Sequence, residues 1–443
     1  MEQTSSPAAH TLPERRSMSP RPIAFDLTRL ITRLRHASPT GIDRVDLAYA
    51  RHVLTGDGPR FGLVTSALGP RVIDRGQASA IVEAVASGWV EDVRPEDDPV
   101  YLGLVGATGG RGPGVSSARR SAFRRRQIQA STTLRMLRGR GIEALPAGTV
   151  YLHSSHLRLD RPERFDWLYA RRDIRPVFFV HDLIPISHPE YGRPGEAARH
   201  AERMRTIARH AAAVIVNSAD VGSRFTRHLA AHGFAARPIT VAPLGVEPIF
   251  SGRDGTAPVF ERPTFLVCGT IESRKNHLLL LQVWRDLAAR HGALTPRLVI
   301  VGRRGWEVEN VIDLLDRCQS IAPHVTEVSG LSTPDLARLM RGATALLMPS
   351  FIEGYGLPVV EAAASGLPVV ASDIPVHREI GARFAQLIDP LDGPGWRQAI
   401  EDLSAPASPL RADLAARLDG YEAPGWPAHL AQLDAALEAV DGG

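Results

Sequence analysis

The sequence has 443 residues, enough for two or three domains, and 44% of them are hydrophobic, as in an ordinary globular protein. Its 52 Lys and Arg residues against 48 Asp and Glu residues give a formal net charge of +4, too small to argue for nucleic acid binding. The two cysteines, Cys268 and Cys318, lie far apart without a partner motif, which excludes a disulfide scaffold and a thiolate zinc site and favours a reducing cytoplasm.

The N-terminal half begins with a polar segment and continues as alternating strands and helices. Residues 1–21 contain Pro, Ser and charges without an apolar core, so we expect a disordered tail and no signal peptide. A strand is predicted at 22–27 and a helix at 41–54. Further apolar runs predict strands at 61–65, 100–104, 149–152, 176–180 and 213–216. This alternation predicts a parallel α/β domain over residues 22–250.

A second α/β domain is predicted after a change in composition. Residues 251–262 are rich in Gly, Ser, Asp, Pro and Arg, which is typical of a linker. Beyond them, strands are predicted at 264–268, 297–301, 324–328, 345–348 and 368–371, with helices between, in a domain over 263–420. Because doubly wound sheets bind ligands beyond the carboxyl ends of their strands, we look for functional residues there.

The segment 351–361, Phe-Ile-Glu-Gly-Tyr-Gly-Leu-Pro-Val-Val-Glu, places two carboxylates around a glycine-rich turn that opens a helix. Gly354 and Gly356 let a ligand approach the backbone, and Pro358 is predicted to be the first residue of the helix. A helix N-terminus favours an anion, while Glu353, before the turn, and Glu361, in the first helical turn, can accept hydrogen bonds from sugar hydroxyls. The combination predicts a nucleotide-sugar site.

This string, followed by Ala-Ala-Ala-Ser-Gly-Leu-Pro-Val-Val-Ala-Ser-Asp, resembles the donor-site signature of retaining GT-B glycosyltransferases, family 4 in particular. The resemblance covers the C-terminal half almost continuously and the N-terminal half mainly around 40–45 and 177–220. It implies two Rossmann-like domains facing a cleft, with 421–443 as a closing helix that returns towards the first domain. It also implies that Glu353 orients the sugar hydroxyls and Glu361 the ribose. The donor-binding residues that it implies in the turn itself are Gly354, Tyr355, Gly356 and Leu357.

A second motif, Cys-Gly-Thr-Ile-Glu-Ser-Arg-Lys-Asn-His at 268–277, follows a predicted buried strand. Arg274 and Lys275 put a planar fork and a point charge on one loop, which fits a diphosphate; a solvated basic loop is the alternative. The string resembles the family pattern Gly-Thr-x-x-x-Arg-Lys-Asn, which implies that both cations bind the leaving diphosphate. With these charges no metal or other cofactor is expected, and Asp97-Asp98 is interpreted as a solvated turn.

Two residues of the first half are candidates for the same site. His181 ends the predicted strand at 176–180; single histidines more often have a structural role, but Val-His-Asp-Leu-Ile-Pro resembles the acceptor-side strand of the family. The resemblance implies that His181 contacts the reacting sugar, while the leaving phosphate takes the acceptor proton. Gly41 aligns with the family's glycine loop. The family usually has a Gly pair where this chain has Thr40 and Gly41. An ordinary N-terminal turn of a helix is therefore the alternative interpretation of this position.

Residues 119–140 are strongly basic, with apolar residues interleaved among the arginines. This pattern predicts either an interfacial helix on anionic lipid, which would suit a lipid-linked acceptor, or a solvated charged face. Nucleic acid is not expected, because no recognisable reading motif accompanies the charge.

Taken with the resemblance, the residues lead us to expect a cytoplasmic, metal-independent, retaining glycosyltransferase, with peripheral contact to the inner face of the membrane through 119–140. It would move a hexose from a nucleotide diphosphate sugar to a cell-surface glycan or lipid-linked precursor, as in lipopolysaccharide or exopolysaccharide synthesis. GDP-mannose is the first donor hypothesis and a UDP-hexose the second. The alternatives are a nucleotide-sugar epimerase, a phosphorylase, or a non-catalytic nucleotide-sugar-binding assembly partner.

Overall fold

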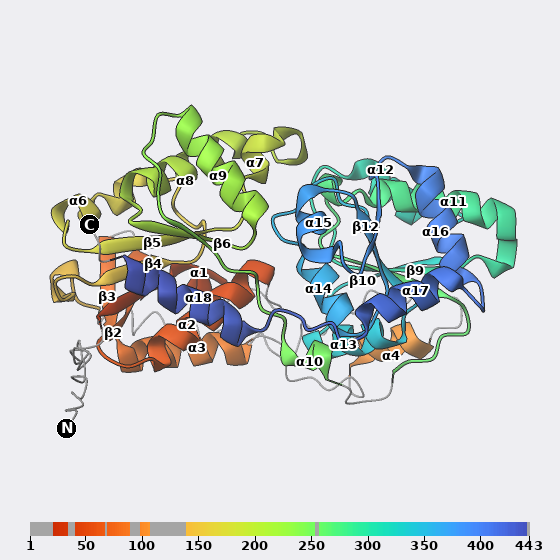
Figure 1. Cartoon of the computed structure of the whole chain (residues 1–443), viewed down its shortest axis with the longest axis horizontal. Helices are drawn as coiled ribbons and strands as arrows, with labels where there is room; N and C mark the ends of the chain where they lie inside the picture. The colour runs from red at the N-terminus through yellow and green to blue at the C-terminus, as the bar shows by residue number, and fades with distance from the viewer. Residues whose placement is uncertain are drawn as a thin grey trace, which may run out of the picture.

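The computed structural model describes residues 21–33, 40–66, 69–88, 98–106, 139–252 and 257–440. Two α/β lobes lie side by side, the N-terminal lobe on the left of Figure 1 and the C-terminal lobe on the right. The predicted tail, apart from Arg21, and the basic segment, apart from residues 139–140, lie outside the described residues.

The N-terminal lobe is built on a seven-stranded sheet in the order β3-β2-β1-β4-β5-β6-β7. Its strands are β1 (Ile23–Asp26), β2 (Arg60–Ser66), β3 (Gly69–Asp74), β4 (Val150–His153), β5 (Arg175–Val180), β6 (Ala213–Val216) and β7 (Ile239–Val241). All neighbours pair in parallel except β2 and β3, which are antiparallel. The predicted strands at 22–27, 61–65, 149–152, 176–180 and 213–216 are confirmed, whereas β3 and β7, which are only partly buried, were not predicted.

The helices of this lobe cover both faces of the sheet (Figure 1). They are α1 (Thr28–Arg33), α2 (Gly41–Thr55), α3 (Arg75–Gly88), α6 (Trp167–Ala170), α7 (Ile184–Ser187), α8 (Glu196–His210) and α9 (Ala219–Ala231), with 3-10 turns at Ile142–Ala144, Pro162–Phe165 and Pro189–Tyr191. Because α2 spans Gly41–Thr55, the helix predicted at 41–54 is confirmed.

The C-terminal lobe has a six-stranded, fully parallel sheet in the order β10-β9-β8-β11-β12-β13. Its strands are β8 (Thr264–Cys268), β9 (Arg297–Val301), β10 (Val325–Val328), β11 (Ala345–Met348), β12 (Val369–Ser372) and β13 (Gln386–Ile388). Its helices are α11 (His277–His291), α12 (Glu309–Arg317), α13 (Thr333–Gly342), α14 (Leu357–Ala364), α15 (Pro375–Gly381), α16 (Gly393–Ser404) and α17 (Pro409–Leu418), with 3-10 turns at Ser273–Lys275 and Gly292–Leu294. All five predicted strands are confirmed, and the partly buried β13 was not predicted.

Both sheets are doubly wound. The chain adds strands first on one side of β1 or β8 and then on the other, so that β1 lies between β2 and β4, and β8 between β9 and β11. Loops that leave the carboxyl ends of such neighbouring strands converge beside the switch in strand order, where ligands of this fold class bind.

The chain passes between the lobes at the linker and again before its last helix. After β7 the chain passes through α10 (Pro248–Ser251) into the linker, and at the end α18 (Trp426–Ala439) returns to pack against α2 of the N-terminal lobe (Figure 1). In α18, His429 donates from Nδ1 to the carbonyl of Pro243 (2.9 Å) and accepts at Nε2 from the hydroxyl of Tyr49 (2.9 Å). None of the described helices is long and apolar enough to span a bilayer.

The strand predicted at 100–104 is wrong, because these residues form a helix, α4 (Pro99–Gly106). A short apolar run fits either state, and here Asp98 accepts a hydrogen bond from the amide of Val100 (2.8 Å) and so favours the helix. Although α4 belongs to the segment predicted for the first domain, it lies beside α13 of the C-terminal lobe (Figure 1). The carbonyl of Leu104 accepts a hydrogen bond from Arg297 of β9 (3.1 Å).

The interpretation of Asp98 as part of a solvated turn is also wrong, since its exposure is 2%. Its carboxyl group shares a hydrogen bond with Asp335 of α13, which requires a proton on one of the two groups. Burial, together with the neighbouring Asp98, raises the pKa of Asp335 to about 6. Asp97 lies outside the described residues.

We expect Asp98→Asn to remove a pH-dependent loss of stability. A carboxyl whose pKa is raised on folding binds a proton that the unfolded chain releases. The free energy of unfolding of the wild type should therefore fall as the pH rises from about 4, the ordinary value, through about 6. The asparagine amide can donate to Asp335 without a proton, so the variant should be the more stable protein at pH 8 but not at pH 4. Urea unfolding at both values measures this, with the exposed Asp313→Asn as control; equal pH profiles for wild type and Asp98→Asn would contradict it.

Candidate functional site

The two motifs predicted in the C-terminal half meet because β8 and β11 are neighbours in the sheet. The amide of Phe351 donates to the carbonyl of Arg274 (2.9 Å) and ties the two loops together. Glu353 lies between the two cations, with Oε2 at 2.7 Å from Nη1 of Arg274 and Oε1 at 2.5 Å from Nζ of Lys275. Ser350 donates to the same Oε1 (2.7 Å). The fold thus brings three predicted site residues into one ionic cluster at the switch in strand order.

This cluster is buried and ionised. Glu353 is 7% exposed, and although burial alone would raise the pKa of its carboxyl, the charges of Arg274 and Lys275 hold that pKa well below its ordinary range. Burial lowers the pKa of Lys275, against the attraction of Glu353. Arg274 has a second partner, Glu272, at 3.0 Å from its Nε. An anion that enters the cluster must therefore compete with Glu353 for both cations.

Lys275 is the only lysine among the 52 Lys and Arg residues of the chain. Its stem passes over Gly269, where a Cβ would lie 3.2 Å from Cε of the lysine and where the backbone has a φ of +133°. Glycine is needed at this position on both grounds. A compact ammonium fits the space over Gly269. The guanidinium of arginine, the side chain at every other Lys or Arg position of the chain, is broader and would not replace it there.

Helix α14 starts one residue earlier than predicted. Gly356, with a φ of +97°, is the N-cap, Leu357 is the first helical residue, and Pro358 is the second, where a missing N–H is still tolerated. Glu361 is therefore in the second turn and not in the first. Its partner is a side chain of the other lobe: Nη1 of Arg44 lies 3.0 Å from Oε1 of Glu361, while Nη2 donates to the hydroxyl of Thr333 (3.0 Å).

His181 follows β5 in the N-terminal lobe, and its backbone carbonyl lies beside Gly354, the residue after Glu353. Its Nε2 lies 2.7 Å from the carbonyl oxygen of Ser154, so Nε2 carries the proton and Nδ1 is left as an acceptor. Burial lowers the pKa of His181 to about 4, which makes the imidazole neutral near pH 7 and a weak base. The backbone amide of His181 donates to Nε2 of His156 (3.2 Å).

The two lobes touch where the loop between β11 and α14 meets the end of β5. A Cβ on Gly354 would lie 2.6 Å from the carbonyl oxygen of His181, so only glycine allows this approach. The carbonyl of Gly354 accepts a hydrogen bond from Ser218 (3.2 Å). The hydroxyl of Tyr355 donates to the carbonyl of Leu244 (3.4 Å), so its buried side chain packs between the lobes. Contact of residues 354–357 with a donor stays a prediction.

Two further contacts join the lobes. The carboxylate of Glu379, in α15, accepts from the amides of Ala219 (2.7 Å) and Asp220 (3.1 Å) at the N-terminus of α9, where the helix dipole favours an anion. The rings of Tyr191 and Phe351 stack with centroids 5.6 Å apart. Sequence reasoning missed these residues and Arg44, because each contact joins segments more than 150 positions apart.

Gly41 is the first residue of α2, after an N-cap at Thr40 whose hydroxyl and backbone form a capping box with Asp43. A Cβ at Gly41 would meet no atom within 4 Å. The position is thus an ordinary helix N-terminal turn with open space beside it, and its contact with a donor stays a prediction.

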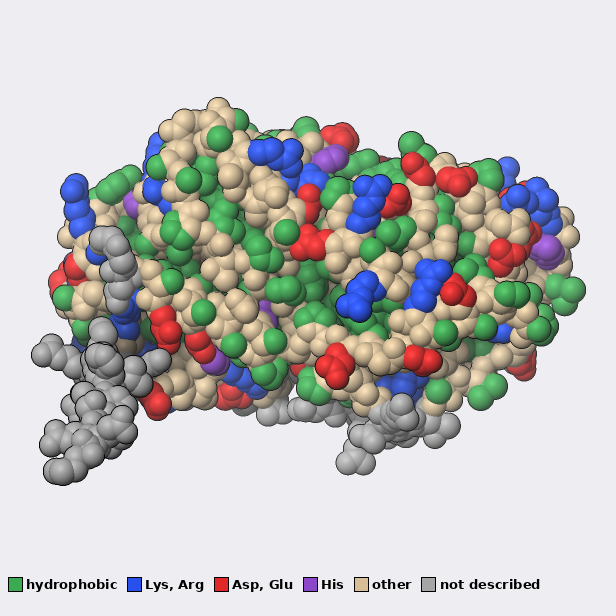
Figure 2. Space-filling view, in the orientation of Figure 1, with side chains coloured by type: hydrophobic (Ala, Val, Ile, Leu, Met, Phe, Trp, Pro, Cys, Tyr) green, Lys and Arg blue, Asp and Glu red, His purple; other side chains and the backbone are tan. Residues whose placement is uncertain are grey.

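Within the described part of the chain, no group of three or more His, Cys, Asp or Glu side chains is placed to hold a metal ion. On the face shown in Figure 2, basic and acidic side chains are interspersed over both lobes, in keeping with the small net charge.

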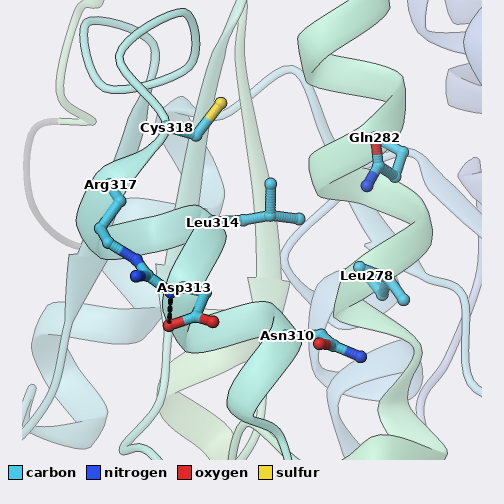
Figure 3. A pocket seen from close by; sticks show the side chains of 7 residues that line it. All are labelled: Leu278, Gln282, Asn310, Asp313, Leu314, Arg317 and Cys318. Carbon is cyan, nitrogen blue, oxygen red and sulfur yellow. Dashed lines mark ion pairs between the residues drawn. The ribbon is translucent and has the colours of Figure 1, made fainter.

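A pocket of about 510 Å³ lies away from the predicted site, between α11 and α12 (Figure 3). Its lining comes from both helices and the residue after α12: Leu278, Gln282, Asn310, Asp313, Leu314, Arg317 and Cys318. None of the predicted site residues lines it, so the pocket is separate from the ionic cluster.

Comparison with known proteins places a family match on the C-terminal lobe. Residues 262–405 match the family described as Glycosyl transferases group 1. The chain is 29% identical over 222 residues to the serotype-specific mannosyltransferase WbdA of Escherichia coli; the match covers 47% of this chain and 27% of that protein. A shorter match, 34% identical over 109 residues, joins it to the O-antigen chain mannosyltransferase RfbU of Salmonella typhimurium, and covers 24% of this chain and 30% of that protein. The chain therefore spans less than a third of the length of either relative.

Solved structures resemble the whole molecule. WaaG, a glycosyltransferase involved in lipopolysaccharide biosynthesis, superposes with a TM-score of 0.57 at 16% identity, over 95% of this chain and 100% of WaaG. Anabaena Alr3699/HepE, solved in complex with UDP, gives a TM-score of 0.57 at 14% identity, over 95% of this chain and 100% of that one. At this identity the likeness shows the fold. The chain thus has the GT-B fold of two Rossmann-like lobes, and residues 262–405, within its C-terminal lobe, match the group 1 glycosyltransferase family.

Proposed function

We propose that the protein is a retaining, metal-independent glycosyltransferase that moves a hexose from a nucleotide diphosphate sugar to a glycan or a lipid-linked glycan precursor. The observation that carries the proposal is the cluster of Arg274, Lys275 and Glu353 beside the switch in strand order, next to Gly354, which packs against the backbone of His181. A leaving nucleoside diphosphate needs positive charge, and both cations are already in place.

Each side chain then has a role that follows from its charge and position. Arg274 and Lys275 bind the diphosphate once it displaces Glu353, and the freed carboxylate turns to the hydroxyls of the sugar. Glu361 accepts from the ribose. His181, neutral with Nε2 held by Ser154, offers Nδ1 to the reacting sugar. Since Glu353 and His181 both have pKa values below their ordinary ranges, neither suits a general base near pH 7, which supports a retaining reaction in which the leaving phosphate takes the acceptor proton.

The names of the relatives favour mannose, so GDP-mannose is the first donor candidate and a UDP-hexose the second. The name of the Salmonella typhimurium relative favours an O-antigen or similar cell-surface glycan as acceptor, and we propose that the transfer takes place at the cytoplasmic face of the membrane. Lipid contact through 119–140 stays a prediction from the sequence, because residues 107–138 lie outside the described structure.

Mass-spectrometric screening of nucleotide sugars, for binding and for slow hydrolysis without acceptor, tests the proposal. We expect one donor to bind and to release its nucleoside diphosphate. Conversion into another nucleotide sugar would instead identify an epimerase, and dependence on inorganic phosphate a phosphorylase. Binding without any turnover, even with glycan acceptors, would identify a non-catalytic partner.

We expect turnover of the donor to persist in excess EDTA, because Arg274, Lys275 and the N-terminus of α14 supply the positive charge that a divalent ion would otherwise supply. Initial rates with and without EDTA, and after addition of Mg²⁺ or Mn²⁺, measure this. Complete loss of turnover in EDTA, restored by either ion, would rule out metal independence.

A further inference from the structure

Among the described residues, the side chain that contacts the carboxylate of Glu361 is that of Arg44, which reaches it from the opposite lobe. The two side chains are largely buried, 19% exposed for Arg44 and 4% for Glu361. The guanidinium bridges two elements of the C-terminal lobe, since it binds Glu361 in α14 and Thr333 at the start of α13. A guanidinium that is bound to two partners has a fixed orientation, so the Arg44 side chain holds Glu361 in one position.

The start of α2 is built so that Arg44 remains available for this contact. Asp43, its neighbour in the sequence, could compete for the guanidinium, but Asp43 is already bound by Arg29 (2.8 Å) and Arg33 (3.0 Å) and is closed into the capping box with Thr40. These contacts also fix the first turn of the helix. The first turn therefore presents Arg44 to the C-terminal lobe, and no acidic side chain in the described part of the N-terminal lobe pairs with it.

We propose that Arg44 is a positioning residue of the donor site, which holds the carboxylate of Glu361 from the opposite lobe so that its second oxygen can accept hydrogen bonds from the ribose of a nucleoside diphosphate. This inference rests on the proposed function, in which Glu361 binds the ribose. Because Arg44 belongs to the N-terminal lobe, the ribose subsite is complete only when the lobes are closed.

The charges around Glu361 support the same role. Burial raises the pKa of its carboxyl, and Glu247, just before α10, acts in the same direction, whereas Arg44 opposes both. The other titratable group beside it, the thiol of Cys268 in β8, is neutral, since burial and Glu361 raise its pKa. Without Arg44, Glu361 would bind a proton at higher pH, and a protonated carboxyl loses an acceptor site for the ribose hydroxyls.

Calorimetric titration of Arg44→Gln with UDP and GDP, and with their 2′,3′-dideoxy analogues, tests this. We expect the nucleotide that the wild type prefers to bind the variant about tenfold or more weakly at pH 7, as expected when a hydrogen bond to a charged group is lost. The loss should shrink as the pH rises, because the carboxyl of Glu361 then loses its proton without the help of Arg44. The dideoxy analogue, which lacks both hydroxyls, should bind wild type and variant alike.

Two controls separate positioning from general support of the fold. Arg51→Gln removes an exposed arginine of the same helix, paired with Glu83 at 2.9 Å, and should bind nucleotide as the wild type does. In a Glu361→Gln background, adding Arg44→Gln should lower nucleotide affinity only a little further, because the two residues act through one contact. Arg44→Lys, which keeps the charge but not the fork, should fall between wild type and Arg44→Gln.

The inference is overturned if Arg44→Gln weakens binding of the dideoxy analogue as much as binding of the natural nucleotide. It is also overturned if Arg44→Gln lowers nucleotide affinity by the same factor in the wild type and in the Glu361→Gln background. Those results would leave the proposed function intact. If the wild type binds neither UDP nor GDP, both donor candidates of the proposed function fail, and this inference fails with them.

Discussion

Replacing Lys275 with methionine should lower the turnover of the donor by roughly two to three orders of magnitude, the effect typical of losing one preplaced group that stabilises developing charge. Methionine keeps most of the stem that passes over Gly269 and removes only the ammonium. The loss should appear in kcat at saturating donor, because the diphosphate gains its full charge in the transition state. Release of nucleoside diphosphate from the donor, with and without acceptor, measures it.

Arg290→Met is the matched control, since Arg290 is an exposed cation of the next helix, paired with Asp286 at 2.9 Å. It should leave turnover unchanged. A Lys275→Met enzyme with near-normal kcat would show that Lys275 serves the structure of the loop and not the leaving group. Lys275→Arg should also lose most of its activity, because the guanidinium is too broad for the space over Gly269.

Replacing Glu353 with glutamine should have two large effects. Turnover should fall by about 100-fold or more, as when a transition-state hydrogen bond from a charged group is lost. The free protein should also unfold more easily, by about 3 to 5 kcal/mol, because the buried ammonium of Lys275 and guanidinium of Arg274 lose their shared carboxylate. A nucleoside diphosphate would supply the missing charge, so saturating ligand should raise the melting temperature more in the variant than in the wild type.

The pH dependence of this effect has a defined sign. A carboxylate whose pKa is lowered on folding stabilises the protein at pH values above the pKa that it has in the unfolded chain. This contribution is lost only as the pH falls through the pKa of the folded state. Since the folded value is well below the ordinary range, the difference in stability between wild type and Glu353→Gln should persist at pH 4. Glu272→Gln, which removes only the second partner of Arg274, should have a smaller effect on both readouts. Equal effects of the two variants would contradict the central place given to Glu353.

The C-terminal lobe could be predicted from the sequence because its strands are continuous apolar runs in a fully parallel sheet. Once 264–268 and 345–348 are identified as strands, a doubly wound order makes them neighbours, so Arg274, Lys275 and Glu353 must meet. The short, partly exposed strands β3, β7 and β13 lack that signal.

Contacts between the lobes could not be predicted in the same way. Arg44 and Glu361 are 317 positions apart, and no local pattern shows which side chain of one lobe faces which of the other. The error at 100–104 has a similar origin, because a five-residue apolar run fits a strand or a helix equally well. Only its packing on the C-terminal lobe, together with the buried Asp98, decides for the helix.

The presence of a single lysine makes this protein unusually open to spectroscopy. Reductive methylation with ¹³C-formaldehyde modifies amines, so apart from the α-amino group it would label only the side chain of Lys275. One dimethylamine resonance would then report on the ammonium that Glu353 now holds, without any mutation or isotope-labelled expression. Its chemical shift should change when a diphosphate replaces the carboxylate. Because the chain has no other lysine side chain, this shift would report directly whether the site is occupied by ligand.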